Sequence, residues 1–171
     1  DTSPSIQEWS DVKGQTLEVI RQISRDGWIP DYVVGLTRGG LTPANLISQY
    51  LEVPMETLKV SLRDDDKGPE HNMWMAEDAA KGTNILIVDD INDSGATLDW
   101  IIEDWQGSCM PKDPAWADVW GNNVRFAVLV ENLDSAIETH YNAVTVNKAE
   151  DNAWINFPWE PGWWVKHIKE L

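Results

Sequence analysis

Hydrophobic residues are concentrated in short runs along the chain, and polar or turn-forming segments separate these runs. Five runs have the length and residue content typical of β-strands; they cover residues 31–36, 55–62, 84–90, 124–131 and 142–147. Three segments carry apolar residues at helical spacing; they cover residues 10–25, 42–51 and 96–105. Strands that alternate with helices predict an α/β fold with a central, mostly parallel sheet flanked by helices.

Three further segments have no regular pattern of apolar residues. Residues 63–82 are rich in charged and turn-forming residues, and a loop of this length in a compact domain is usually functional or disordered. Residues 107–123 form a second irregular segment. Residues 151–165 are rich in tryptophan, and we expect this aromatic tail to fold over one edge of the sheet.

Length and composition predict one globular domain over residues 1–171. The chain is 42% hydrophobic and 25% charged, which is ordinary for a folded protein. Its net charge of −16 argues against nucleic acid or an anionic membrane as a partner, because both would be repelled. No apolar run approaches the roughly 20 residues that span a bilayer. The first residues show no basic and apolar leader, and Cys109 is the single cysteine, so we expect a cytoplasmic protein.

The segment 85–97, ILIVDDINDSGAT, contains the strongest chemical signal in the chain. An apolar strand is expected to end in two carboxylates, Asp89 and Asp90, and a short loop leads to a helix that begins near Thr97. Ligands of an open α/β sheet bind where the strands end, and a helix N-terminus offers free N–H groups to a phosphate. The carboxylate pair suits ribose hydroxyls, or a Mg²⁺ ion shared with them. This segment therefore predicts a site for a ribose and its phosphate.

This order of strand, acidic pair and Ser-Gly-x-Thr loop resembles the signature with which type I phosphoribosyltransferases bind phosphoribosyl pyrophosphate (PRPP). Asn92 departs from it, because the family usually has an aliphatic residue there. The resemblance implies that Asp89 and Asp90 hold the ribose and Mg²⁺, and that Asp93 is catalytic and shares a proton of the base. It implies a 5′-phosphate site made of Asp93, Ser94, Gly95, Ala96 and Thr97. The alternative is a capped helix after a strand whose acidic residues are merely solvated.

A second stretch, GLTRGGLTPANL at residues 35–46, contains a turn between a strand and a helix. Bare glycine amides and the Arg38 guanidinium would together bind an anion. The stretch is similar to the strand-x-SRGGL-x-P pattern of bacterial xanthine–guanine phosphoribosyltransferases, with Thr37 in place of the serine. By this resemblance Arg38 and Gly39 bind the pyrophosphate of PRPP. Taken alone, Arg-Gly-Gly would be a plain turn more often than a binding site.

A third stretch, DNAWINFPW at residues 151–159, resembles the purine-binding tail of the same enzymes. The resemblance implies that Trp154 stacks on the base and that the main chain of Ile155 hydrogen-bonds the edge of the base. Because the chain has 11 tryptophans, a place in the core or in an interface is the alternative for Trp154.

The resemblance covers nearly the whole chain and implies a Mg²⁺-dependent enzyme that joins PRPP to a purine base, namely xanthine, guanine or hypoxanthine. Homodimers or homotetramers are the expected assemblies. Residues 63–82 would be a mobile lid that excludes water, and residues 145–171 a small aromatic hood that binds the base. Residues 107–123 would be an insertion, either a subunit contact or a surface loop.

Glu131 breaks the family pattern. Relatives that use 6-oxopurines usually place a lysine near the end of the fourth strand, where it donates to the 6-oxygen, and Glu131 is the nearest match here. An ionised carboxylate cannot donate. Three explanations stay open: the base differs, Lys148 at the next strand end supplies the donor, or the alignment is shifted. Glu131 could equally face solvent at a strand end.

Three other functions compete with this interpretation. A regulatory protein with the same fold could sense PRPP or a nucleotide without catalysis, although Asp93 favours an enzyme because binding alone has less need of it. A phosphoribosyltransferase for a pyrimidine is a second possibility, and the Trp154-Ile155 pair argues for a purine instead. An unrelated P-loop enzyme is disfavoured because no G-x-x-x-x-G-K-[ST] motif occurs.

Overall fold

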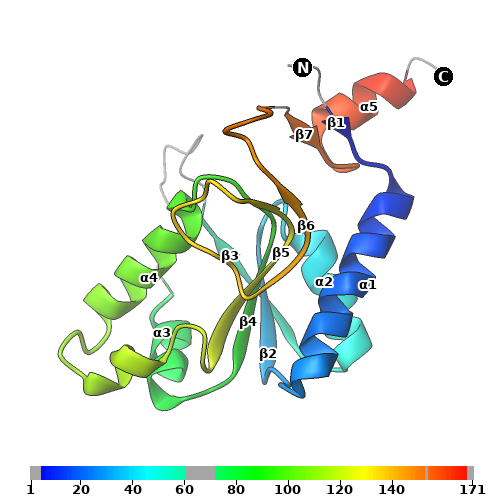
Figure 1. Cartoon of the computed structure of the whole chain (residues 1–171). Coiled ribbons are helices and arrows are strands. Elements are labelled where there is room, and N and C mark those ends of the chain that lie inside the picture. Colours follow the sequence, from blue (N-terminus) through cyan, green and yellow to red (C-terminus); the bar gives the residue numbers. More distant parts are fainter. Residues whose placement is uncertain (1–4, 61–71, 153, 169–171) are drawn as a thin grey trace.

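The computed structural model describes residues 5–60, 72–152 and 154–168. Its centre is a five-stranded sheet in which every pairing is parallel, in the order β3-β2-β4-β5-β6 (Figure 1). The predicted α/β fold is confirmed, and each predicted strand is present. The strands are β2 (Tyr32–Thr37), β3 (Met55–Lys59), β4 (Ile85–Asn92), β5 (Val124–Asn132) and β6 (Tyr141–Val146).

Helices cover both faces of this sheet (Figure 1). One face is covered by α1 (Trp9–Asp26) and α2 (Leu41–Leu51), and the other by α3 (Met73–Lys81) and α4 (Ala96–Ser108). None of the helices in the described part of the chain is both long enough and apolar enough to cross a bilayer.

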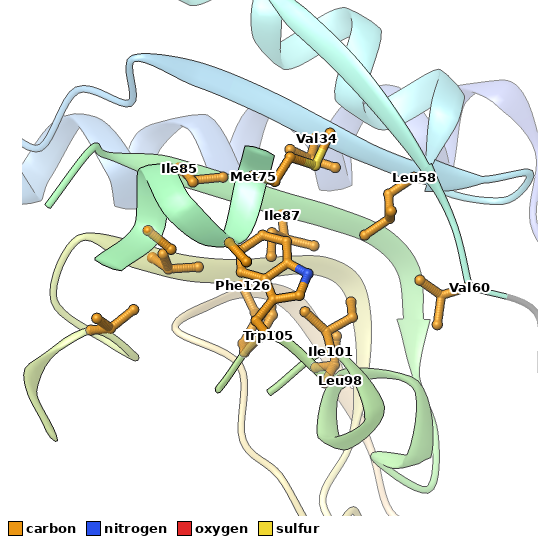
Figure 2. Close-up of a cluster of buried hydrophobic side chains, with 14 of the residues drawn as sticks. Val34, Leu58, Val60, Met75, Ile85, Ile87, Leu98, Ile101, Trp105 and Phe126 are labelled. Atoms are coloured by element: carbon orange, nitrogen blue, oxygen red, sulfur yellow. The ribbon is translucent and has the colours of Figure 1, made fainter. Parts of the chain in front are cut away.

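The two apolar layers explain why β4 is a nearly continuous hydrophobic run. Successive side chains of a strand point to opposite faces. Ile85 and Ile87 therefore pack with α3 and α4, whereas Leu86 and Val88 pack with α1 and α2. Figure 2 shows the first of these layers, where Trp105 of α4 lies among side chains from the sheet. A strand that is buried on both faces has no room for polar residues until it reaches the end of the sheet.

Helix α3 corrects the prediction that residues 63–82 form a loop. Asn72 caps this helix, because its side chain accepts a hydrogen bond from the main-chain N–H of Met75 at 3.4 Å. The buried side of α3 includes Ala76 and Ala79, and such small residues give little hydrophobic contrast in a sequence. Residues 61–71 lie outside the described part of the chain, so the lid stays a prediction for residues 63–71.

The predicted insertion at 107–123 is mostly irregular, as expected, but it is an integral part of the core. It contains a short 3-10 helix, Pro114–Asp118, and Trp116 is buried against the α3–α4 layer. The Trp116 indole donates to the main-chain oxygen of Cys109 at 2.9 Å, and Trp120 stacks between Trp116 and Phe126. The segment is therefore packed onto the domain and is not a free surface loop.

The aromatic tail has regular structure that the sequence pattern did not predict. Strand β7 (Ile155–Asn156) pairs in parallel with β1 (Ser5–Ile6), and helix α5 (Pro161–Ile168) follows. Phe157 is fully buried with residues of α1 and β5, and partly buried side chains at the ends of β4 and β6 pack around it. The hood thus lies against the end of the sheet at which β4, β5 and β6 finish.

The strand order places a ligand crevice at the ends of β2 and β4. The chain passes from β2 to β3 on one side and then returns to β4 on the other side of β2. In open parallel sheets, ligands bind outside the carboxyl ends of the strands where the direction of the connections reverses.

Replacing Phe157 with alanine should lower the free energy of unfolding by about 3–5 kcal/mol, because a fully buried aromatic ring is removed and a cavity is left. Urea denaturation followed by tryptophan fluorescence measures this change. Trp164→Ala is the matched control, since Trp164 of the same hood is half exposed. A loss no larger than that of the control would contradict the anchoring role of Phe157.

Candidate active site

A cleft of about 590 Å³ lies at the carboxyl ends of β2 and β4 and beneath the hood. Its size falls in the range of small-molecule sites. Every residue to which the sequence assigned a role lines this cleft: Arg38, Gly39, Asp89, Asp90, Asp93, Ser94, Gly95, Ala96, Thr97, Trp154 and Ile155. The fold therefore brings three stretches that are far apart in the sequence to one place, while their individual roles stay predictions.

The turn between β2 and α2 approaches β4 so closely that only glycine fits. A Cβ atom on Gly39 would overlap the carboxylate of Asp90, and one on Gly40 would overlap the main-chain oxygen of Val88. The Thr37–Arg38 peptide bond at the start of the turn is cis. The Arg-Gly-Gly sequence is thus a close-approach turn at the cleft rather than an ordinary surface turn.

The acidic pair at the end of β4 is held by main-chain and indole donors. Asp89 accepts from the N–H of Asp90 at 2.9 Å, and Asp90 accepts from the N–H of Ile91 at 2.8 Å and from the Trp159 indole at 3.3 Å. Burial, reinforced by repulsion from Asp90, raises the pKa of the Asp89 carboxyl well above its usual value. Burial also raises the pKa of Asp90, against the opposing effect of its donors.

These two carboxylates fit a divalent cation that is shared with a ligand. Within the described ranges, neither of them forms an ion pair, so a cation would relieve their mutual repulsion. Among the described residues, no three or more His, Cys, Asp or Glu side chains lie close enough together to hold a metal ion without other ligands. Mg²⁺ suits such a site, because it is usually bound by one or two carboxylates while water and substrate oxygens complete its octahedron.

The loop between β4 and α4 presents a helix N-terminus to the cleft. Gly95 precedes α4 with φ +90°, and a Cβ at this position would lie 2.8 Å from Ser135 Oγ. Gly95, at the N-cap position, has no side chain to cap the helix, and the N–H of Ala96 donates to Ser94 Oγ at 3.2 Å. The N–H groups that follow in the first turn are available to an anion. The N–H of Ala136 donates to the main-chain oxygen of Ser94 at 3.0 Å, which fixes the loop to the β5–β6 connection.

A lysine and a tryptophan face each other across the outer part of the cleft. Lys148 lies just after β6, and its Nζ is 3.0 Å from Oδ2 of Asp93 and 6.0 Å from the centre of the Trp154 ring. The side chain of Lys148 is only 13% exposed, whereas Trp154 is 53% exposed and lines the cleft. A flat ligand could stack on Trp154 and reach both charged groups.

The main chain of Ile155 is directed away from β1. The N–H of Ser5 in β1 donates to the main-chain oxygen of Trp154 at 2.7 Å, and the N–H of Gln7, just after β1, donates to that of Asn156 at 2.8 Å. In a parallel pair, the intervening residue points its own N–H and C=O to the other side. Ile155 lines the cleft, so these groups are positioned to bind the edge of a ligand.

Glu131 has a structural role, and the interpretation that it faces solvent is wrong. It is buried, and its register partner in β4 is Asn92, the other residue that departs from the family pattern. Glu131 accepts from Asn92 Nδ2 at 2.6 Å, from the Thr139 hydroxyl at 2.7 Å and from Asn142 Nδ2 at 2.9 Å. The two departures thus compensate each other through one hydrogen bond, and Glu131 is absent from the lining of the cleft.

Two residues of the site were missed by the sequence analysis. The Trp159 indole bonds Asp90, and Asn132 of β5 bonds Asp93. Trp159 belongs to the Pro-Trp pair of the tail, which already suggested a place near a ligand. Nothing in the sequence indicated its contact with Asp90. Asn132 had no signal, because its partner lies 39 residues away in the sequence.

Replacing Glu131 with lysine should destabilise the protein by at least about 3 kcal/mol, because several buried donors lose their acceptor and a cation is buried among them. Thermal denaturation measures the effect. Glu138→Lys is the control, since it makes the same charge change at an exposed position of the same connection. Equal melting temperatures for the two variants would contradict the buried network.

The chain is similar to several proteins of known name. Over 149 residues the chain is 29% identical to xanthine-guanine phosphoribosyltransferase from Roseobacter denitrificans, a match that covers 79% of this chain and 74% of that protein. It is 38% identical over 85 residues to the enzyme of the same name from Cereibacter sphaeroides, covering 44% of this chain and 51% of that protein. The structure of Helicobacter pylori xanthine-guanine-hypoxanthine phosphoribosyltransferase superposes over 100% of both chains with a TM-score of 0.69, at 18% identity.

The family model described as the phosphoribosyl transferase domain matches residues 5–165, nearly the whole chain. The loop after β4, the acidic pair and the glycine turn after β2 all lie within this match. The chain therefore belongs to the phosphoribosyl transferase domain family.

Proposed function

We propose that this protein is a purine phosphoribosyltransferase, which transfers the 5-phosphoribosyl group of PRPP to a purine base and yields a nucleoside 5′-monophosphate and pyrophosphate. The observation that carries the proposal is a single cleft that joins the N-terminus of α4, a carboxylate pair and an aromatic ring beside a lysine. Relatives named xanthine-guanine phosphoribosyltransferase support a purine as the acceptor.

PRPP would lie along the ends of β2 and β4. The first turn of α4 and the Ser94 hydroxyl would bind the 5′-phosphate, and Asp89 and Asp90 would hold the ribose hydroxyls. Arg38 and the main chain of Gly39 would bind the pyrophosphate. Asp89 and Asp90 would also hold Mg²⁺. When bound, this ion would neutralise the charge of the pyrophosphate.

The base would stack on Trp154, and the charged side chains of Lys148 and Asp93 would form hydrogen bonds with one of its edges. Lys148 is a donor only, so it would bind an exocyclic oxygen and would repel an amino group at the same position. Asp93 is an acceptor and would bind a ring N–H beside that oxygen. This pair favours a 6-oxopurine, such as xanthine, guanine or hypoxanthine, over a 6-aminopurine. It also answers the question raised by Glu131, because the donor would come from the end of β6 and not from the end of β5.

Transfer would then depend on positioning and on the electrostatics of the cleft. A ring nitrogen of the base forms a bond to the anomeric carbon, and pyrophosphate leaves with the electron pair of its bond to that carbon. The positive charge that develops on the sugar is close to Asp89 and Asp90, which stabilise it. The proton that the base loses would pass to the Asp93 carboxylate, while Lys148 stays as its ion-pair partner.

The proposal is tested by pyrophosphate release from PRPP with xanthine, guanine, hypoxanthine, adenine, orotate and uracil offered separately. We expect turnover with at least one 6-oxopurine, little with adenine and none with the pyrimidines. Chelation of divalent cations should abolish turnover, and added Mg²⁺ should restore it. Binding of PRPP in calorimetry without turnover of any base would reject the enzyme and support a PRPP-sensing regulator.

Lys148→Met should raise the KM for the preferred 6-oxopurine about tenfold or more, because a hydrogen bond from a charged donor contributes about 1.5–3 kcal/mol. The KM for PRPP should stay within about twofold. Lys81→Met is the control, since Lys81 is an exposed residue at the end of α3. An unchanged KM for the base would reject Lys148 as the donor.

The expectations of a homodimer or homotetramer and of a cytoplasmic location stay predictions. Size-exclusion chromatography with light scattering would give the assembly directly.

A further inference from the structure

Asn132, the last residue of β5, has a side chain that links the two charged residues at the base end of the cleft. Its Nδ2 lies 3.0 Å from the main-chain oxygen of Asp93 and 3.3 Å from Oδ1 of the same residue. Its Oδ1 accepts from the main-chain N–H groups of Lys148 and Asp134, both at 3.1 Å. The side-chain amide therefore donates to Asp93 and accepts from Lys148 at the same time.

The position of Asn132 in the sheet explains why it can do this. Asp93 follows β4 and Lys148 follows β6, and β5 lies between these two strands. The last residue of β5 is thus the point at which one short side chain can reach both neighbouring strand ends. In register, Asn132 pairs with Val146 of β6, two residues before Lys148.

The amide has little freedom to adopt another arrangement. Asn132 is 6% exposed, and a flipped amide would direct its oxygen at the oxygens of Asp93 and its nitrogen at two N–H groups. The adjacent Glu131 is held by the buried network with Asn92 and Thr139, which fixes the end of β5. The direction of all four bonds is consequently determined by the donors and acceptors around them.

We infer that Asn132 is a positioning residue, which sets the separation and orientation of the Asp93–Lys148 pair and thereby the way in which the base is bound and deprotonated. The inference rests on the proposed function, because it assigns Asn132 a part in purine transfer. Asn132 itself is absent from the lining of the main cleft, so it acts through Asp93 and Lys148. Catalysis of this kind is sensitive to displacements of about 1 Å in the groups that hold the reactants.

The test is Asn132→Asp, which keeps the shape and the acceptor toward Lys148 but places an oxygen against the two oxygens of Asp93. Asn123→Asp is the matched control. Asn123 is also 6% exposed, and its Nδ2 donates to the oxygens of Ala79 and Thr83, both at 2.9 Å, near the start of β5. Both variants should lose thermal stability. Only Asn132→Asp should lower kcat/KM for the base at least about tenfold while leaving the KM for PRPP within about twofold.

A second comparison covers the case in which Asn132→Asp fails to fold. Asn132→Ser retains a hydroxyl donor near Asp93, and it should show a smaller loss in kcat/KM for the base than Asn132→Ala. Asn123→Ser and Asn123→Ala should leave this parameter unchanged. Equal losses for serine and alanine at position 132 would overturn the role of the donor.

A double-mutant cycle with Lys148→Met separates positioning from general destabilisation. If Asn132 acts through the pair, the combined loss in kcat/KM should be smaller than the product of the single losses. Asn123→Asp combined with Lys148→Met should give the simple product. Simple products in both cycles, or an Asn132→Asp variant that differs from Asn123→Asp only in melting temperature, would overturn the inference alone. A wild-type protein that uses no purine would instead reject the proposed function, and the inference with it.

Discussion

The cleft depends on the close contact between the β2–α2 turn and the end of β4. Gly39 and Gly40 bring their main chain against Asp90 and Val88, where a single Cβ atom would already overlap. This contact places the Arg38-Gly39-Gly40 turn beside the carboxylate pair, at the point where the direction of the connections reverses. A side chain at either glycine would separate the two halves of the cleft, and with them the groups proposed to bind pyrophosphate and ribose.

The proposed substrate PRPP is anionic, whereas the chain has a net charge of −16, so binding would depend on the local field of the cleft. The cleft contains three groups with positive potential, namely the N-terminus of α4, Arg38 and Lys148. Main-chain N–H groups bind phosphate through hydrogen bonds at short range, so they do not depend on the net charge of the protein. Burial raises the pKa of both Asp89 and Asp90, and repulsion from Asp90 adds to the shift of Asp89.

Two neighbouring residues at the end of β5, Glu131 and Asn132, form different sets of contacts. Glu131 accepts several hydrogen bonds and ties the β5–β6 connection to β4, whereas Asn132 bonds residues that line the cleft. Buried polar groups of this kind are stable only when each has a partner. Such a network makes the end of β5 rigid, and it gives Glu131 a structural role at the position where the family resemblance led us to expect a lysine.

The sequence by itself determined where the five strands of the central sheet and most of the helices lie along the chain, because these follow from periodic patterns over neighbouring residues. The order of the strands in the sheet came only from the structure. The sequence also predicted a site at Asp89, Asp90 and residues 93–97, since a strand, an acidic pair and a Ser-Gly-x-Thr loop lie in one continuous segment, and the fold places these residues along one cleft. The sequence analysis missed helix α3, because its buried side includes small alanines, which give little hydrophobic contrast in a sequence. The burial of Glu131, the contact between Trp159 and Asp90, and the place of Asn132 between Asp93 and Lys148 were decided only by the tertiary structure. Each joins residues from different strands or from the hood, so no local pattern contains them, and only the packing of the sheet and hood brings the partners within hydrogen-bonding distance.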